Sequence, residues 1–511
     1  MRIAGLAFRA TEPTFLKTTE PLLRSDWMFH RGGAVMITDA ERIAVEDGDF
    51  QDLGSNAVVV SAHARGIAIR RNVIARIGAS AISFVGKPDA VRSPLFEYNE
   101  SLPLGKIDRT PGPKTDDYPA DSVAQDKLIH DIGLIEKQSA GVQIAMAARI
   151  TVDHNSIYRV PRSGINVGDG TWGGHRITNN DVFDTVRESG DHGAYNSWGR
   201  DRYWHPDRPE MDRRTTADRS LVTLDAVETI VLRNNRFQCD HGWDVDLDDG
   251  SSNYLIEGNL MLSGGLKLRD GFDRVARNNI LLNNSFHPHV WFDNGHDVFE
   301  RNIVMAAYQP IRVKTWGKSV DYNLFASAND VKLAQANGTD ANSLAGDPQF
   351  VAWRKGDYWV RPTSPAVKLG FANFPMDDFG VRTPRLRALA EQPQYPRPVL
   401  APRADQRETP QAFADMMIKS VETLGEQSAA GLPTKAGAIV LTVAAGGAAA
   451  KAGLVSGDVI QTIDGTSDAL GQDIVSAASF ITAAQGRRWQ GSIIITVFRN
   501  QKPVKLKLKI Q

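Results

Sequence analysis

The stretch from Cys239 to Trp291 reads CDHGWDVDLDDGSSNYLIEGNLMLSGGLKLRDGFDRVARNNILLNNSFHPHVW. It contains three short runs in which every second residue is apolar, beginning at Trp243, Gly265 and His289. Alternation with a period of two predicts strands that bury one face. The opposite face of these runs carries carboxylates, basic groups and aromatic rings. The stretch therefore predicts a functional surface spread over consecutive turns of a repeat.

An asparagine recurs before each apolar strand, and its spacing defines the repeat. The series is Asn72, Asn155, Asn180, Asn235, Asn259, Asn279, Asn302 and Asn323, with Asp49 and Asp131 at equivalent places. Uninterrupted steps are 20 to 25 residues long, which is typical of one coil of a parallel β-helix. Stacked amides can hydrogen-bond from one coil to the next. A leucine-rich repeat has a similar period, but the leucine spacing and the helices it needs are missing.

Two long insertions interrupt the repeat, at 86–125 and at 197–220. The second one interleaves aromatic residues with arginines, including Trp198 and Arg200. Long ordered loops are often functional, and such a loop is suited to stacking on sugar rings. The plainer interpretation is a surface loop that packs on its own aromatic residues.

Composition narrows the class of protein. The 511 residues suffice for more than one domain, and 59 basic against 60 acidic residues give no reason to expect a nucleic-acid or membrane partner. A single cysteine, Cys239, excludes an intrachain disulfide. No segment is apolar for long enough to span a membrane, and the N-terminus has no visible signal peptide. The chain begins as if already inside a strand.

We expect a mainly β protein in three parts. These are a right-handed parallel β-helix over 1–380, a proline-rich linker over 381–410, and a small α+β domain over 411–511 that opens with a helix at 411–424. The last part resembles a PDZ domain, through AAAKAGLVSGDVI at 448–460 and Ile463-Asp464-Gly465. The resemblance implies capture of a peptide on a sheet edge. A purely structural dock against the β-helix remains the alternative.

Alignment of the coils on the asparagine series places the outward residues of one sheet in columns. One column contains Asn166, Asn196, Asp246, Lys267, Trp291 and Arg312, the next Gly168, Trp198, Asp248, Arg269, Asp293 and Lys314, and a third Asp244 and His289. The bland interpretation is a solvated ladder of alternating charge. The histidine and tryptophans on the same face favour a functional site.

Glycoside hydrolysis fits this surface, because it uses one carboxyl group as acid and another as base or nucleophile. Asp246 and Asp248 would lie about 6.7 Å apart on one strand, and they are the first candidates for the catalytic pair. Asp191, Asp270 and Asp293 are the substitutes. No cofactor is expected for this reaction.

Polysaccharide lyase chemistry is the alternative. Asp244, Asp246 and Asp248 would then hold Ca²⁺, an ion that prefers oxygen ligands. Lys267 would abstract the proton next to a uronate carboxylate, and Arg269 would neutralise that carboxylate. A third possibility, from another class, is a non-catalytic carbohydrate-binding scaffold in which the PDZ module binds a peptide.

Further residues are expected to contact the carbohydrate substrate. They are Asp191, His192, Asn196, Trp198, Arg200, Asp244, Lys267, Arg269, His287, His289, Trp291 and Arg312.

Several motifs rich in glycine and aspartate resemble glycoside hydrolase family 141. They are LRSDW at 23–27, HRGGAV at 30–35, GDGTWGGH at 168–175, GDHGAYNSWGRD at 190–201 and DLDDG at 246–250. The resemblance covers about residues 1–375. It implies a right-handed β-helix, an α-L-fucosidase-like or xylanase-like hydrolysis of a poly- or oligosaccharide, a carboxylate pair on the β-helix face, and a periplasmic or extracellular location.

Overall fold

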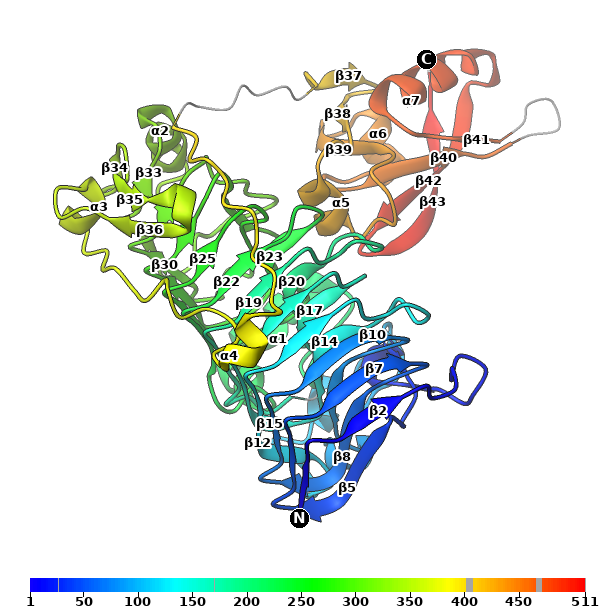
Figure 1. Cartoon of the computed structure of the whole chain (residues 1–511). Helices are drawn as coiled ribbons and strands as arrows, with labels where there is room; N and C mark the ends of the chain where they lie inside the picture. The colour runs from blue at the N-terminus through cyan, green and yellow to red at the C-terminus, as the bar shows by residue number, and fades with distance from the viewer. Residues whose placement is uncertain (26, 170, 401–407, 466–470, 511) are drawn as a thin grey trace. The chain divides into compact units, whose positions relative to one another are not determined.

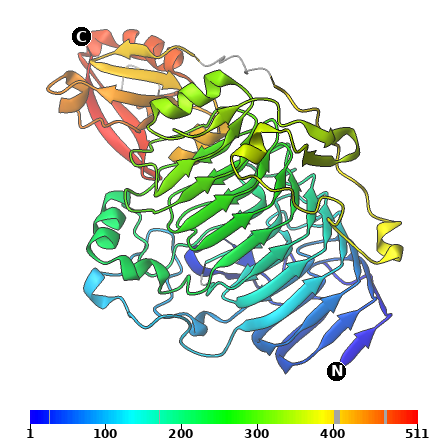
Figure 2. The ribbon, with the colours of Figure 1, turned by 90° about the vertical axis from the view of Figure 1, so that its left-hand side faces the viewer.

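Parallel strands make up most of the chain, as the computed structural model shows (Figures 1 and 2). It describes residues 1–25, 27–169, 171–400, 408–465 and 471–510. The chain divides into two compact units, Met1–Pro402 and Arg403–Gln511. No helix in these described ranges is long and apolar enough to cross a membrane.

A 20-stranded sheet forms two of the strand rows in the first unit. Its strands are β1 (Arg2–Ala4), β5 (Val35–Glu41), β6 (Ala44–Glu46), β8 (Val58–Arg65), β9 (Ala68–Arg70), β11 (Ile82–Val85), β12 (Pro119–Gln125), β14 (Ala140–Ala145), β15 (Ala148–Asp153), β17 (Ser163–Val167), β18 (Arg176–Thr178), β20 (Gly193–Ser197), β21 (Ile230–Arg233), β23 (Trp243–Leu247), β24 (Tyr254–Glu257), β26 (Leu266–Leu268), β27 (Arg274–Arg277), β29 (Phe286–Pro288), β30 (Val298–Glu300) and β32 (Ser319–Asp321). One row pairs β11, β14, β17, β20, β23, β26 and β29 in succession, all in parallel.

A 12-stranded sheet forms the third row. In order, it contains β2 (Ala7–Arg9), β7 (Asp49–Leu53), β10 (Val73–Ile77), β13 (Leu128–His130), β16 (Ser156–Tyr158), β19 (Asp181–Phe183), β22 (Arg236–Gln238), β25 (Leu260–Met261), β28 (Ile280–Leu281), β31 (Ile303–Val304), β33 (Leu324–Phe325) and β34 (Leu344–Ala345). Each strand pairs in parallel with the strand one repeat later. Three rows of strands, joined by short turns, give the arrangement of a parallel β-helix.

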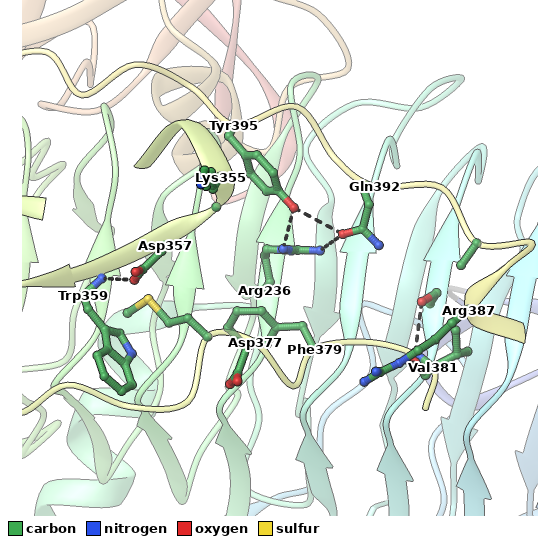
Figure 3. Close-up of a pocket in the computed structure, with 14 residues that line it drawn as sticks. Arg236, Lys355, Asp357, Trp359, Asp377, Phe379, Val381, Arg387, Gln392 and Tyr395 are labelled. Atoms are coloured by element: carbon green, nitrogen blue, oxygen red, sulfur yellow. Dashed lines mark hydrogen bonds between the residues drawn. The ribbon is translucent and has the colours of Figure 1, made fainter. Parts of the chain in front are cut away.

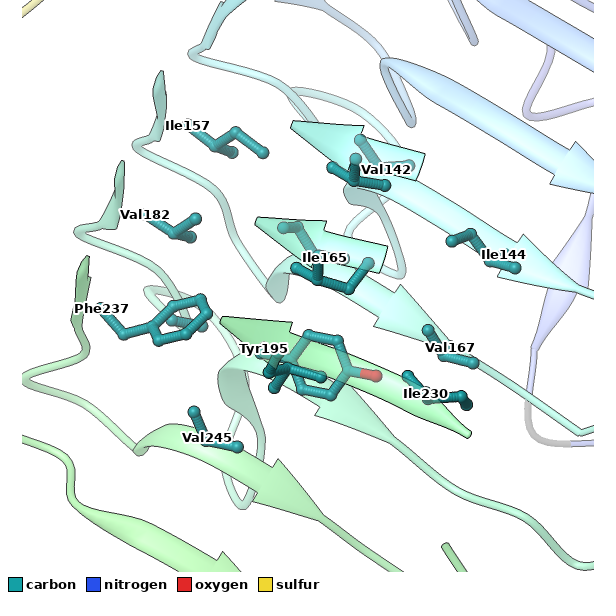
Figure 4. Close-up of a cluster of buried hydrophobic side chains, with 14 of the residues drawn as sticks. Val142, Ile144, Ile157, Ile165, Val167, Val182, Tyr195, Ile230, Phe237 and Val245 are labelled. Atoms are coloured by element: carbon teal, nitrogen blue, oxygen red, sulfur yellow. The ribbon is translucent and has the colours of Figure 1, made fainter. Parts of the chain in front are cut away.

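The core of this unit is a column of apolar side chains that repeats from coil to coil (Figure 4). Val142 lies beside Ile165, Ile165 beside Tyr195, and Tyr195 beside Val245 in strand register. All four are fully buried. Because side chains alternate between the faces of a strand, the residues between them point outward.

The predicted asparagine ladder is present. The Asn155 side-chain amide donates to Asn180 Oδ1 at 2.8 Å, and Asn180 in turn donates to Asn235 Oδ1 at 2.9 Å. The same amide-to-amide bond continues along the series to Asn259, Asn279, Asn302 and Asn323, at 2.9 to 3.2 Å. Each amide also donates to a backbone carbonyl of the preceding coil, so the ladder satisfies polar groups that are otherwise buried.

Asp49 and Asp131 do not belong to the ladder, which corrects the predicted series. Strand register aligns Val73 with Asp49 and with Leu128, so the places equivalent to Asn72 are Gly48 and Lys127. Lys127 is fully buried, and its Nζ donates to the Ile69 carbonyl at 3.1 Å. Burial lowers the pKa of this lysine well below its ordinary value. A search of the sequence for Asn or Asp at this place in each repeat therefore misses Gly48 and Lys127.

The two insertions pack together beside the coils. Helix α1 (Arg208–Ala217) lies in the second one. A buried cluster joins Ile107 of the first insertion to Tyr203 and Trp204 of the second, and to Phe272 of the coil. The insertions therefore have an aromatic core of their own, as the plainer interpretation predicts.

The segment over 381–400 is not a free linker, which corrects the expected boundary. Leu386 of α4 (Pro384–Arg387) is fully buried in a cluster with Tyr158. The Val381 amide donates to Ser156 Oγ at 3.2 Å, and the Val399 amide donates to Asn283 Oδ1 at 2.8 Å. Proline is frequent here because the segment crosses the coils in extended form rather than because it is unattached. The rest of the expected linker lies mostly outside the described residues.

Other elements close the first unit. They are β3 (Glu20–Pro21), β4 (Met28–Phe29), α2 (Ala328–Ala336), β35 (Phe350–Ala352), β36 (Asp357–Val360) and α3 (Pro365–Lys368).

In its described ranges, 408–465 and 471–510, the second unit contains a seven-stranded sheet and three α-helices. Its elements are β37 (Gln411–Phe413), β38 (Met416–Ser420), α5 (Leu424–Ala430), β39 (Ala438–Val443), α6 (Ala448–Lys451), β40 (Val459–Ile463), β41 (Gln472–Asp473), α7 (Ala477–Gln485), β42 (Ser492–Arg499) and β43 (Lys502–Lys509).

The helix predicted at 411–424 is wrong, because this segment forms the hairpin of β37 and β38. Ala414 and Asp415 both have positive φ, 46° and 62°, which is the backbone of a two-residue hairpin turn. The apolar residues of the segment fit both a helical and a strand period. Neither turn residue is glycine or asparagine, so the sequence gives little sign of the turn.

Candidate active site

One row of polar side chains runs along the outer face of β17, β20, β23, β26 and β29. Asn196 lies beside Asp246, Asp246 beside Lys267, and Lys267 beside His287 in strand register. Asn166 precedes Asn196 in the same row. The structure therefore has the predicted neighbours as far as Lys267.

The predicted column is wrong at the next coil, where His287 takes the place expected for Trp291. Trp291 is 2% exposed, and its indole N–H donates to the Leu268 carbonyl at 2.9 Å, so it cannot form a wall for a sugar. In the coil from Asn279 to Asn302, the additional residues follow β29 (Phe286–Pro288). The sequence alignment assumes that they precede this strand.

Asp293 and Arg312 also fall outside the site. Asp293 is exposed, and its carboxylate accepts a hydrogen bond from Thr315 Oγ1 at 3.3 Å. Arg312 is exposed and follows Ile311, which bridges to His289. Both lie in turns. The sequence alignment assigns them to the sheet because its register is wrong from this coil onward.

Lys267 is the centre of the candidate site. Its Nζ lies 3.2 Å from Asp191 Oδ1, 3.1 Å from Asp246 Oδ1 and 3.2 Å from Asp248 Oδ1. The side chains of Lys267 and Asp246 are completely buried, whereas Asp191 and Asp248 are 24% and 26% exposed. Two partly exposed carboxylates therefore share one buried ammonium group. Asp191 Oδ1 and Asp248 Oδ1 each lie 3.2 Å from Lys267 Nζ, so these two oxygen atoms are separated by no more than twice that distance.

The pKa values of Asp246, Asp248 and Lys267 are shifted in different ways. Burial raises the pKa of Asp246 well above its ordinary value; the Lys267 charge opposes this shift, and the nearby Asp248 charge adds to it. Burial also opposes ionisation of Asp248, but Lys267 and Arg269 outweigh it and lower its pKa to about 2. Burial opposes the charge of Lys267, but the surrounding carboxylates outweigh it and raise its pKa. Burial thus favours the neutral form of Asp246, whereas Asp248 is ionised and Lys267 is charged.

Arg269 extends the cluster to one side. Its Nε lies 2.9 Å from Asp249 Oδ1 and 3.7 Å from both Asp248 and Asp270. Asp270 is 3% exposed, and its other oxygen lies 4.0 Å from Arg208 Nε. This second group of carboxylates is joined to the first through Asp248.

Asp249 is a site residue that sequence reasoning missed. It is 6% exposed, and its Oδ2 accepts a hydrogen bond from the Tyr98 hydroxyl at 3.4 Å. Burial raises the pKa of Asp249 to about 7, although Arg269 opposes the shift. Its position just after β23 in DLDDG was the available signal. Tyr98 comes from a distant insertion, and no sequence pattern connects it to this strand.

Trp243 and the histidines line the other side of the cluster. The Trp243 indole N–H donates to Asp191 Oδ1 at 3.1 Å, and Lys267 Nζ lies 5.6 Å from its ring. The His287 ring meets Trp243 edge-on at 4.7 Å, and burial lowers the pKa of His287 to about 3. His289 is fully buried, and neither of its ring nitrogens has a hydrogen-bond partner among the described residues. Burial keeps it neutral by lowering its pKa.

Asp244 has a structural role, which corrects its assignment to substrate or metal. It is fully buried, and its carboxylate accepts hydrogen bonds from the backbone N–H groups of Cys239, Ser263 and Gly265 at 2.7 to 3.2 Å. Burial raises its pKa to about 7. The side chain braces the corners of two coils and does not reach the outer face.

Three other predicted contacts are held within the protein. Asn196 is 1% exposed and donates to Asn166 at 3.4 Å. Trp198 is 5% exposed and stacks near Trp27, with ring centroids 6.3 Å apart. Arg200 is 4% exposed and pairs with Asp169 at 3.0 Å. These residues support the site wall rather than presenting a free sugar platform.

His192 lies at the edge of the site, next to Asp191. Its Nδ1 lies 3.0 Å from Ser189 Oγ, and burial lowers its pKa well below the ordinary value. His192 is therefore neutral at physiological pH, and with Nδ1 in contact with Ser189 it offers only Nε2 beside an accessible carboxylate.

Comparison with known proteins leaves the family open. No family model matches this chain. No curated protein matches it either. Among solved structures, a chain titled glycoside hydrolase is similar with a TM-score of 0.33 and 12% identity, over 58% of this chain and 38% of that chain. The match spans less than half of that protein, and a likeness this distant identifies neither a family nor an activity.

Proposed function

We propose that the first unit hydrolyses a glycosidic bond in a poly- or oligosaccharide, with Asp191 and Asp248 as the reacting carboxyl groups. The observation that carries the proposal is the Lys267 ammonium within 3.2 Å of both, while both remain partly exposed. Two carboxyl groups that flank one bond are what glycoside hydrolysis requires. Asp246, our first choice from the sequence, is completely buried and takes a supporting role here.

Asp248 acts as the base or nucleophile in this proposal, because its lowered pKa of about 2 keeps it ionised. Asp191 is the other partly exposed carboxyl group at Lys267, and we assign it the role of donating the proton to the leaving oxygen. Lys267 orients both carboxylates and stabilises negative charge near the reacting centre. Asp246, whose pKa burial raises, contacts the same ammonium group and takes no direct part in the reaction.

The lyase alternative has less support. A lysine that abstracts a proton must first be neutral, but the neighbouring aspartates outweigh burial and raise the pKa of Lys267. The proposed Ca²⁺ ligand Asp244 is turned toward backbone amides. The Lys267 ammonium lies between Asp246 and Asp248, in the place that a cation would need.

The right-handed sense of the coils, the α-L-fucosidase-like or xylanase-like specificity and the periplasmic or extracellular location remain part of this proposal. We also propose that the second unit is PDZ-like and takes a peptide partner. The quoted motif supports this, since it forms α6 followed by β40 at the centre of the sheet.

A panel of plant and algal polysaccharides tests the reaction class. We expect reducing ends to appear in the presence of EDTA, without the ultraviolet absorbance of an unsaturated uronate. Asp191→Asn and Asp248→Asn should each lower turnover by at least ~10²-fold. Asp293→Asn, an exposed aspartate outside the cluster, is the matched control and should stay near normal. Loss of activity in EDTA, rescue by Ca²⁺ and rising absorbance would establish the lyase instead.

A further inference from the structure

A cavity lies over the 12-stranded sheet, whereas the carboxylate row belongs to the 20-stranded sheet (Figure 3). Its volume is about 570 Å³, within the range of about 300–1,000 Å³ that holds small ligands. The walls come from three C-terminal segments and the floor from the sheet. The lining residues include Arg236, Lys355, Trp359, Asp377, Phe379 and Tyr395.

Arg236 forms a rigid floor for this cavity. Its guanidinium makes two hydrogen bonds to Asp181, at 2.8 and 2.6 Å. It also donates to the Tyr395 hydroxyl at 3.1 Å and to Gln392 Oε1 at 2.9 Å. Its carbon Cζ lies 5.3 Å from the ring centroids of both Phe379 and Tyr395. The charge of Arg236 is thus neutralised by Asp181, and the two rings are fixed in place.

Aromatic and polar groups remain available above this floor. Trp359 is 44% exposed, although its indole N–H is used by the Phe374 carbonyl at 2.6 Å, so only the ring surface is open to a ligand. The side chains of Lys355 and Asp377 are exposed, and the described part of the chain shows no hydrogen bond or ion pair for either. The Lys355 ammonium group is therefore available as a hydrogen-bond donor, and the Asp377 carboxylate is available as an acceptor.

The formal charges that line the cavity balance. Lys355 and Arg387 oppose Asp357 and Asp377, and Arg236 is paired with Asp181. A cavity of this kind has no net field to attract a phosphate or a polyuronate. An open indole face with separate hydrogen-bonding groups suits a ring that has apolar C–H faces and a rim of hydroxyl groups.

We propose that this cavity binds a neutral oligosaccharide, as an accessory site separate from the carboxylate cluster. Trp359 stacks on one sugar ring, and Lys355 and Asp377 bond to hydroxyl groups. The site goes beyond the proposed hydrolysis and does not require it. Such an accessory site would hold one part of a polysaccharide chain while another part of the same chain reaches the carboxylate cluster.

Calorimetric titration of the full chain with xylohexaose and with cellohexaose tests the proposal. The Asp248→Asn background prevents turnover, and we expect two binding events per chain. Adding Trp359→Ala should remove one event or weaken it by at least about tenfold, whereas Trp359→Phe should keep it. Trp489→Ala, which removes a tryptophan that is 66% exposed in the second unit, is the matched control and should change neither event.

Failure of the proposed hydrolysis gives a different pattern, since the event at the carboxylate cluster is then missing while the event sensitive to Trp359 persists. Lys355→Ala and Asp377→Ala repeat the test with exposed side chains if Trp359→Ala does not fold. Unchanged affinity in all three variants, tighter binding of trigalacturonate than of the neutral sugars, or no heat with either hexasaccharide would overturn the accessory site.

Discussion

Asp246 lies on β23 and Asp248 directly after it, yet the protein shifts their pKa values in opposite directions. Asp246 has no exposed side-chain surface, whereas Asp248 is open on one side and lies next to two cations. Sequence alone placed both on one face, because the period of a strand requires it. It could not separate their roles, because depth within the face depends on contacts from neighbouring coils, such as those that Asp191 and Lys267 make.

Asp246→Asn should affect turnover far less than Asp248→Asn. The amide is nearly isosteric with the neutral carboxylic acid that burial favours at this position, so the charge of the cluster is unchanged. We expect a loss well below the ~10²-fold scale of acid–base catalysis, measured on the best substrate of the panel. Equal losses in both variants would return Asp246 to the catalytic pair.

Lys267→Met should lower the free energy of unfolding by about 3–5 kcal/mol at neutral pH, as expected when one partner of a buried charge cluster is removed. In the wild type, the lowered pKa of Asp248 gives stability that is present above about pH 4 and is lost as the pH falls toward 2. Without the lysine, the buried carboxyl groups bind protons more readily when folded than when unfolded. The variant should therefore gain stability as the pH falls.

Denaturant titrations of the two proteins between neutral and acidic pH measure these slopes. Lys314→Met, which removes an exposed lysine, is the control. Parallel pH dependence in wild type and Lys267→Met would contradict the assigned charges.

At the scale of single elements, the asparagine ladder was the most predictable feature. One amide per coil, at steps of 20 to 25 residues, identified the strand rows and the register of most coils. The prediction failed where a coil gained residues within one of its turns, as after β29. An insertion changes the length of the coil without indicating which turn contains it.

Lys127→Asn should stabilise the protein by about 1–2 kcal/mol at neutral pH, because it replaces a buried amine with the amide that the ladder uses elsewhere. The folded pKa of Lys127 is lowered, so the unfolded chain binds more protons and the wild type gains stability as the pH rises toward the ordinary lysine pKa. The advantage of the variant should shrink between pH 7 and about 10. A melting temperature below that of the wild type at pH 7 would contradict this.

At the scale of the whole molecule, the division into two units was foreseen, but their boundary was not. Proline content suggested a linker from residue 381, whereas burial of Leu386 and Val381 assigns that segment to the coils. A high proline content indicates that a segment forms no regular helix or strand. It does not indicate whether the segment packs against the rest of the protein.

A chain that ends at Gly380 should be less stable than one that ends at Pro402, by at least about 2 kcal/mol, since it loses a fully buried leucine. Both lack the second unit, so the comparison isolates residues 381–402. Equal melting temperatures would restore the predicted boundary.

The asparagine ladder also bears on hydrogen exchange. Side-chain amides normally exchange with solvent much faster than strand amides, but those from Asn155 to Asn302 donate to the next coil and are buried. Their protons should therefore persist in deuterated solvent for as long as the stack stays closed. Each coil would carry its own reporter, and the order in which these signals decay would reveal the end from which the helix frays.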